Sequence, residues 1–400
     1  MNRTVFLSSL FFIAFLSLFA NSSCNKEPGA TPTPASPSIS IADISAERQS
    51  AQSSVFFFVT LSSQSATDVA VSYRLREGTA KFNTDFIDKQ GTVTVPAGAL
   101  SVSFEVIVAG GDLRKENVNF FVELHNPIGC TLADSVAVAT IIDENGLRLP
   151  TANTGYTTPN SYPGYTLAWS DEFDGAALNT ASWNYEIGNG SNGWGNNERQ
   201  YYTSRTKNVF LSEGNLIIEA RKDNIENFLY SSARLTTKGK REFQFGRIDM
   251  RAKLPKGQGI WPALWMLGAN INSVGWPSCG EIDIMELVGH EPNRVHGTLH
   301  WRGVDGHLYR GSSTALSSGD FSDEFHVFSL IWQEDSLVWY VDDREFYRMT
   351  RADFGAAAYP FNAPQFFIFN VAVGGNWPGD PNPSTTFPQR MFVDYVRIFQ

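Results

Sequence analysis

The chain has 400 residues, more than one ordinary domain holds, so two or three domains are expected. Its 42% hydrophobic and 18% charged residues exclude a disordered protein. A net charge of −10 excludes a general nucleic-acid-binding protein, which needs a basic face. Three cysteines, Cys24, Cys130 and Cys279, are too few for a disulfide-stapled scaffold or for a four-thiolate zinc site.

Residues 1–23 have the pattern of an export signal. A basic residue precedes an apolar run over residues 5–20, which is shorter than the roughly 20 residues of a membrane helix. Small residues before Cys24 resemble a bacterial lipoprotein signal, so we expect lipidation at Cys24. The protein would then lie at the cell envelope, facing outside the cytoplasm, with the lipid anchor as its membrane contact. Asn21 stands where such signals usually carry an aliphatic residue, so a secretory signal cut near Ala20 is the alternative.

Composition divides the rest of the chain into four segments. Residues 24–38 form a Pro/Ser/Thr-rich tether, and the Pro/Thr/Asn-rich residues 146–164 form a linker. Residues 39–145, between the tether and the linker, make a first domain without tryptophan. All ten tryptophans lie in the second domain, residues 165–400. We expect both domains to be all-β.

The first domain consists of short β-branched runs, such as VFFFVTL and VSFEVIV, which alternate as the strands of an antiparallel Ig-like β-sandwich do. The segments YRLREGTAKFNTDF, PAGALSVSFEVIV and VAVATIIDEN resemble the Calx-beta family. That resemblance implies calcium at one end of the domain, held by Asp85, Asp112, Glu116 and Asp143. The alternative is that these acidic side chains face water in loops. Because the domain offers no tryptophan for stacking on sugars, we interpret it as a spacer.

The second domain has strand patterns throughout. RIDMRAKL, residues 247–254, alternates polar and apolar side chains, which predicts a strand buried on one face. FFIFNVAV, residues 366–373, is continuously apolar, which predicts a strand covered on both faces. LVWYVDDREF predicts a hairpin that turns at Asp342 and Asp343. So many strands in one domain predict the two packed sheets of a β-jelly roll sandwich.

Other motifs exclude several chemistries. GNGSNG, residues 188–193, matches a dinucleotide-binding loop, but WGNNERQYY follows it in place of a helix. The sequence has neither a phosphate-binding GK[ST] loop nor the zinc motif H-E-x-x-H. His296 and His300 fall on one face of a strand, and a pair without a third ligand favours hydrogen bonding over metal binding.

Three carboxylates, Glu281, Asp283 and Glu286, stand in the otherwise apolar segment CGEIDIMELVG. Buried unpaired carboxylates are costly, so we expect these side chains to face a cleft. Neighbouring carboxylates raise one another's pKa, so one can serve as a protonated acid and another as an ionised nucleophile, as glycosidases require. Trp261 and Trp265 lie just upstream, where their rings would stack on sugars. An acidic metal site or a solvated strand face is the alternative.

The segments WPALWML, GEIDIMELVG and HGTLHW resemble glycoside hydrolase family 16, and within it the laminarinases, which are endo-acting β-1,3-glucanases. WSDEFDG, NNERQYYT, FGRIDMRAKLP, NVAVGGNWPG and FVDYVRIF extend the resemblance over nearly all of residues 165–400. The resemblance implies a jelly roll whose concave sheet binds β-glucan, with no cofactor for catalysis. We also expect a monomer. Hydrolysis of mixed-linkage β-glucan, agar or carrageenan, and glycan binding without turnover, are the alternatives.

The resemblance implies roles for individual residues. Glu281 matches the nucleophile, Glu286 the general acid/base, and Asp283 a residue that balances the proton between them. It implies substrate contacts for Asn196, Arg234, Trp261, Trp265, His300 and Trp377. It also implies a structural calcium on the convex face, held by Glu172, the backbone of Gly214, and Asp394. The alternatives are packing of Trp377 within its loop, turn chemistry around Glu172 and a surface position for Asp394.

The spacing of the carboxylates predicts a local irregularity in their strand. Side chains alternate along a strand, so Glu281 and Asp283 face one side, while Glu286, at an odd offset from Glu281, would face the other. The two carboxylates of a retaining glycosidase lie on one face, about 5 Å apart. One extra residue restores the parity, so we expect a β-bulge with Met285 as the bulged residue.

Overall fold

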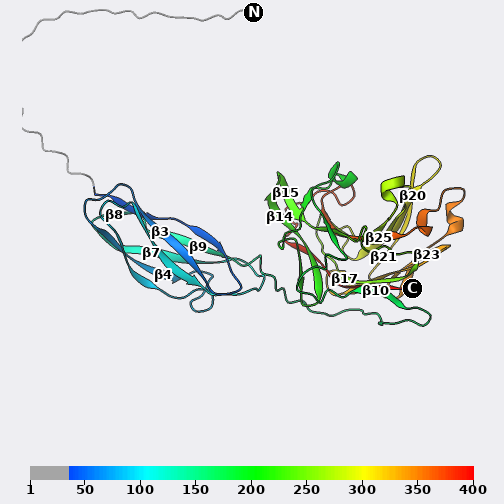
Figure 1. The fold of residues 1–400 in the computed structure, drawn as a ribbon, viewed down its shortest axis with the longest axis horizontal. Helices are drawn as coiled ribbons and strands as arrows, with labels where there is room; N and C mark the ends of the chain where they lie inside the picture. The colour runs from blue at the N-terminus through cyan, green and yellow to red at the C-terminus, as the bar shows by residue number, and fades with distance from the viewer. Residues whose placement is uncertain (1–35) are drawn as a thin grey trace, which may run out of the picture.

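The computed structural model describes residues 36–400, which form two β domains in succession along the chain (Figure 1). The expected signal peptide of residues 1–23, the lipidation at Cys24 and the tether up to residue 35 lie outside the described residues. Strands dominate both domains, so the all-β class is confirmed. Within the described part of the chain, no helix is long and apolar enough to cross a membrane.

The first domain is a sandwich of two sheets, with strand orders β6-β3-β1-β8 and β2-β9-β7-β4-β5. Along β3, Phe57 and Val59 are buried whereas Phe56 and Phe58 are exposed, which is the alternation that the sequence predicts. The strands are β1 (Ser38–Ile41), β2 (Ile44–Glu47), β3 (Ser53–Leu61), β4 (Val69–Glu77), β5 (Gln90–Val95), β6 (Ser101–Val108), β7 (Val118–Ile128), β8 (Thr131–Asp134) and β9 (Val136–Ile142).

The outer sheet of the second domain has the order β12-β15-β14-β26-β17-β22-β23-β24, and β10 and β13 pair with β26 and β14. Antiparallel pairing dominates this sheet, as in a jelly roll. Its strands are β10 (Leu167–Asp171), β12 (Gln200–Tyr202), β13 (Val209–Ser212), β14 (Asn215–Ile225), β15 (Phe228–Ser232), β17 (Gly246–Lys253), β22 (His326–Gln333), β23 (Ser336–Val341), β24 (Arg344–Thr350) and β26 (Gln389–Phe399).

The inner sheet has the order β11-β16-β25-β18-β19-β20-β21. Its strands are β11 (Asn184–Glu186), β16 (Arg234–Thr236), β18 (Ile260–Gly268), β19 (Glu281–Glu286), β20 (Arg294–Arg302), β21 (His307–Ala315) and β25 (Gln365–Val373). The connections contain the short helical turns η1 (Gly193–Asn197), α1 (Ile271–Val274), η2 (Arg351–Phe354) and η3 (Pro360–Asn362). One core of apolar side chains from both sheets, including the fully buried Trp183, Trp332 and Trp339, holds this sandwich together.

Two local predictions for the second domain are confirmed. Every residue of β25 is buried, as its continuous apolar run predicts. The β23–β24 hairpin turns at Asp342 and Asp343, whose φ angles of 51° and 59° are those of a two-residue type I′ turn.

The prediction that β17 is buried on one face only is wrong. Arg251 and Asp249 on its polar face are fully buried, because the linker that follows the first domain packs over that face. The Arg251 guanidinium donates hydrogen bonds to the carbonyl oxygens of Tyr156 and Thr154, at 2.6 and 3.2 Å. The hydroxyl of Tyr162 donates to Asp249 at 2.7 Å. The linker is therefore an ordered part of the outer surface of the second domain, and Figure 1 shows the chain passing beside β17 and β10.

A buried arginine joins the two domains. The side chain of Arg114, from the first domain, is 1% exposed, and its Nη1 lies 3.1 Å from a carboxylate oxygen of Glu219 on β14. Its guanidinium also stacks on the ring of Phe210, 3.9 Å from the centroid. Nearer the surface, Arg221 on β14 pairs with Glu144 at 3.0 Å. These side-chain contacts, in addition to the linker, hold the first domain against the outer sheet of the second.

Candidate active site

The concave face of the inner sheet contains a cleft of about 840 Å³. Glu281, Asp283 and Glu286, all from strand β19, line this cleft together. The cleft also contains the six residues for which substrate contacts were expected, Asn196, Arg234, Trp261, Trp265, His300 and Trp377. These nine residues come from four strands, β16, β18, β19 and β20, and from two connecting segments, so the fold gathers in one place what the sequence spreads over residues 196–377.

A β-bulge puts all three carboxylates on the cleft face. Asp283 pairs with Thr298 and Glu286 with His296 on β20, so β19 uses one residue more than its neighbour between these two pairs. The predicted extra residue is confirmed, but its position differs by one. Met285 keeps Leu264 of β18 as its partner, and Ile284 is the residue without a partner there. Both side chains are buried in the core, which anchors the bulge beneath the carboxylates.

Two neighbouring side chains, those of Trp276 and His300, stabilise the negative charge of Glu281. Trp276 Nε1–H donates a 2.7 Å hydrogen bond to Oε2, and His300 Nε2 lies 3.7 Å from Oε1. Burial, together with the negative charge of Asp283, raises the pKa of Glu281 to about 7. His300 and the Trp276 hydrogen bond act in the opposite direction and favour the ionised form.

Asp283 and Glu286 have pKa values well above the ordinary range of a carboxylate. Burial is the cause for Asp283, whose side chain is 3% exposed. For Glu286, burial acts first, and the negative charges of Asp283 and Glu281 add to it. Trp261 Nε1–H donates to Glu286 at 3.1 Å. Glu286 can therefore act as the protonated acid, and Glu281, whose partners favour ionisation, can act as the nucleophile. A glycosidase needs one carboxyl group in each of these states.

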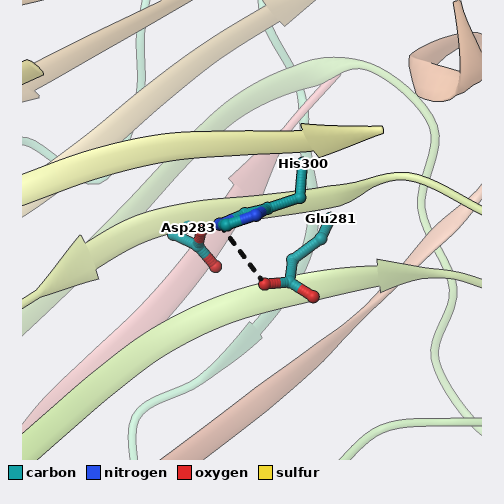
Figure 2. Close-up of side chains that lie close together, drawn as sticks. All are labelled: Glu281, Asp283 and His300. Atoms are coloured by element: carbon teal, nitrogen blue, oxygen red, sulfur yellow. Dashed lines mark ion pairs between the residues drawn. The ribbon is translucent and has the colours of Figure 1, made fainter. Parts of the chain in front are cut away.

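His300 is the centre of a cluster that the sequence only partly indicated. Its Nε2 lies 3.2 Å from Oδ2 of Asp283, and Figure 2 shows its ring reaching between Asp283 and Glu281. On the other side, its Nδ1 shares a 2.9 Å hydrogen bond with Nε2 of His307. His307 was not among the expected residues, nor was Trp276 expected to bind Glu281. Alternation along the β20–β21 hairpin could have indicated His307, since His300 pairs with Tyr309 and His307 lies two residues away on the same face.

The expected sugar-binding residues fall into two groups around the carboxylates. Arg234 lies between two indole rings, 4.3 Å from the centroid of Trp194 and 4.8 Å from that of Trp265. Arg234 also pairs with Glu186 on β11. Trp265 donates its indole N–H to Asn370 at 2.8 Å. One ring face of Trp265 is therefore covered by the guanidinium of Arg234.

The second group lies beside Glu286. The ring of Trp377 is 5.6 Å from that of Trp261 and 4.9 Å from that of His296. Trp377 is 41% exposed, so its ring offers free apolar surface to the cleft.

The two carboxylates expected to hold a structural calcium together with the backbone of Gly214 do not fit such a site. Glu172 pairs with Arg397 at 2.6 Å, and Asp394 pairs with Arg251 at 2.8 Å. Each carboxylate thus has its own arginine, and an arginine beside a carboxylate opposes the binding of a cation.

The three aspartates expected to bind calcium in the first domain do not fit such a site either, and the fourth expected ligand, Glu116, is exposed. Arg48 lies between Asp85 and Asp143, with contacts of 2.7 and 2.5 Å. Lys115 adds a second cation 3.3 Å from Asp85, and Asp112 pairs instead with Arg148. Positive side chains therefore stand where a calcium ion would have to bind.

Comparisons with known proteins agree with this geometry. The family model described as glycosyl hydrolases family 16 matches residues 196–397, and the Calx-beta domain model matches residues 35–145. A beta-glucanase of Rhodothermus marinus is 42% identical over 254 residues, which cover 60% of this chain and 86% of that protein. Glucan endo-1,3-beta-glucosidase A1 of Niallia circulans is 39% identical over 276 residues, 62% of this chain, and the match spans 39% of that longer protein.

Solved structures give the same result. The laminarinase catalytic domain of Thermotoga maritima is 46% identical, with a TM-score of 0.56, and the match covers 59% of this chain and 98% of that one. An endo-beta-1,3-glucanase from Pyrococcus furiosus is 45% identical, with a TM-score of 0.55, over 59% and 94% of the two chains. The sequence motifs, the bulged carboxylate strand and these matches together place the chain in glycosyl hydrolases family 16, with a Calx-beta domain in front of its hydrolase domain.

Proposed function

We propose that the protein hydrolyses internal β-1,3-glucosidic bonds of laminarin-type β-glucans with retention of the anomeric configuration. The observation that carries the proposal is the bulge in β19, which brings Glu281, Asp283 and Glu286 to one face of an open cleft. The relatives whose names specify β-1,3-glucan support the choice of linkage.

The reaction takes two steps. Glu281 attacks the anomeric carbon and forms a glycosyl ester, while Glu286 gives its proton to the departing glycosidic oxygen. Glu286, now ionised, removes a proton from a water molecule that attacks the same carbon and releases Glu281. Each step inverts the carbon, so the product keeps the β configuration.

The neighbours of the carboxylates assist this cycle. The Trp276 N–H and the His300 ring stabilise the negative charge on Glu281 before the attack and after release. The negative charge of Asp283, whose own pKa burial raises, also raises the pKa of Glu286 and so helps Glu286 to hold the proton that it gives to the leaving group. Trp276, which bonds Glu281, and Trp377, which lies beside the Trp261 that bonds Glu286, are exposed and would stack on glucosyl units on either side of the scissile bond.

Product analysis on laminarin, curdlan, lichenan and agarose tests the proposal, with Glu281→Gln as the inactive control. We expect oligosaccharides from laminarin and curdlan, and β-anomers as the first products in proton NMR. Products from agarose alone would reassign the substrate, and α-anomers first would contradict the two-carboxylate mechanism. Tight binding of laminarin without products would support the glycan-binding alternative.

For the location, we propose a mature chain that begins at lipidated Cys24 and displays a monomeric enzyme at a bacterial cell envelope. The support is the signal-like sequence of residues 1–23. Mass spectrometry of the mature N-terminus tests it: a diacylglyceryl-modified Cys24 is expected, and an unmodified N-terminus before or after Cys24 would show a plain secretory signal. Light scattering of the purified chain tests the monomer.

A further inference from the structure

Glu281, Asp283 and His300 each point one possible metal-ligand atom toward the others, and these three atoms lie within 4.8 Å of one another (Figure 2). His300 Nε2 lies 3.2 Å from Oδ2 of Asp283 and 3.7 Å from Oε1 of Glu281. A tetrahedral zinc ion with bonds of about 2.0 Å to nitrogen and oxygen has ligands about 3.3 Å apart. The Asp283–His300 separation matches that edge length, and a movement of the Glu281 side chain would bring its Oε1, now 3.7 Å from His300 Nε2, to the same distance.

A second observation at the same place favours a cation as the ligand. Oδ2 of Asp283 is buried, in a residue that is 2% exposed, and accepts no hydrogen bond, because His300 Nε2 lies 3.2 Å away without the geometry of one. A buried carboxylate oxygen without a partner is costly, and a cation in front of it would remove that cost. This oxygen faces His300 Nε2, and the adjacent Glu281 has its other oxygen, Oε2, already bound by Trp276. Oε1 of Glu281 is thus the free oxygen on the side of His300.

His307 prepares His300 for this role. An imidazole that binds a metal uses the lone pair of one nitrogen, and the proton on the other nitrogen is held by a hydrogen-bond acceptor. The 2.9 Å bond between His300 Nδ1 and His307 Nε2 supplies such a partner and leaves Nε2 of His300 free to coordinate. The Trp276 ring packs on His307, 4.5 Å between centroids, and keeps the pair in place.

The donor set selects the class of ion. Calcium and magnesium prefer shells of oxygen ligands, six or more in number, whereas one imidazole and two carboxylates suit zinc or cobalt. We propose that Glu281, Asp283 and His300 bind a zinc-class divalent ion in the free cleft, with water as the fourth ligand, and that this ion and the glucan exclude each other. The exclusion follows because the ion occupies the oxygen of Glu281 that would attack the sugar. The exclusion of glucan by the ion rests on the proposed function of Glu281, whereas the binding of the ion does not.

Cobalt(II) added to the full chain tests the binding without any measurement of activity. We expect one equivalent of cobalt to give the intense visible absorption of a tetrahedral site, and zinc to remove it. His300→Gln should lose this absorption. His307→Gln should weaken the affinity by about 10- to 100-fold, as loss of the hydrogen-bond partner of a metal ligand does. His296→Gln is the matched control, since His296 lies in the same cleft but outside the group of three, and it should bind cobalt as the wild type does.

Zinc inhibition of laminarin hydrolysis tests the exclusion. We expect zinc to raise KM and leave kcat unchanged, chelation to restore the rate, and calcium at the same concentration to have no effect. An absence of cobalt absorption, or the same absorption in His300→Gln, would overturn the site. Zinc binding that leaves KM unchanged would overturn the exclusion. If the chain binds cobalt as expected but cleaves no glucan, the proposed function fails and the metal site stands.

Discussion

The indole N–H of Trp276 donates a 2.7 Å hydrogen bond to Oε2 of Glu281, and this bond links a half-exposed loop residue to the proposed nucleophile. Only the ionised carboxylate gains fully from such a donor, because a charged acceptor makes the stronger bond. The bond therefore opposes burial and the charge of Asp283, which both raise the pKa of Glu281. Trp276 thus helps to set the pH at which the nucleophile becomes active.

Trp276→Phe removes this donor and keeps an aromatic ring. The pKa of Glu281 should rise further, so the acid limb of the kcat/KM profile should move to higher pH, by at most about one unit. Trp377→Phe is the matched control, because Trp377 lies in the same cleft and its contacts are to aromatic rings. Its profile should keep the wild-type acid limb. Equal shifts in both variants would show that the effect comes from general packing in the cleft.

Asp283→Asn should move the acid limb in the opposite direction. The negative charge of Asp283 raises the pKa of Glu281, and the amide removes that charge, so Glu281 should ionise at lower pH. The same change should lower the pKa of Glu286 and bring the alkaline limb down as well. We expect kcat to fall at neutral pH, because Glu286 then loses its proton more easily. An acid limb that stays in place would contradict the coupling between these carboxylates.

Glu281→Gln should stabilise the protein at neutral and alkaline pH. The pKa of Glu281 is about 7 in the folded protein against 4.5 in the unfolded chain, so the folded state holds more protons between these values. Stability is therefore lost as the pH rises from 4.5 to 7, and the cost is complete above pH 7.

The glutamine cannot ionise and avoids this cost, which is at most about 3 kcal/mol. Calorimetry should show a higher Tm than the wild type at pH 8 and an equal Tm at pH 4. Glu334→Gln, at an exposed position, is the control and should change neither value. A gain of equal size at both pH values would have to come from packing and not from ionisation.

Arg114→Ala should separate the unfolding of the two domains. The substitution removes the ion pair with Glu219 and the stacking on Phe210, which together join the first domain to β14. Glu219 keeps Arg390 at 2.7 Å, so we expect a moderate loss, about 1–3 kcal/mol. In calorimetry, we expect one transition for the wild type and two for the variant. Arg74→Ala, an exposed arginine within the first domain, should leave the transition unchanged.

Local sequence patterns determine the strands and the chemistry of this protein. Alternation places Phe57 and Val59 in the core of the first domain, and the continuous apolar run of β25 predicts its complete burial. The odd offset between Glu281 and Glu286 requires an extra residue if both side chains are to face the cleft, and the bulge supplies it. These inferences hold because side-chain direction along a strand depends on the nearest neighbours in the chain.

The tertiary structure decides which side chains meet. Arg397 neutralises Glu172 from 225 residues away, Arg251 reaches Asp394 over 143, and Arg48 reaches Asp143 over 95, so the expected calcium residues are paired by partners that no local pattern reveals. Two other contacts also depend on the fold and not on a local pattern. The linker covers the polar face of β17, and the β20–β21 hairpin brings His307 next to His300. A charge interacts with whatever the fold brings within a few ångströms, irrespective of separation along the chain.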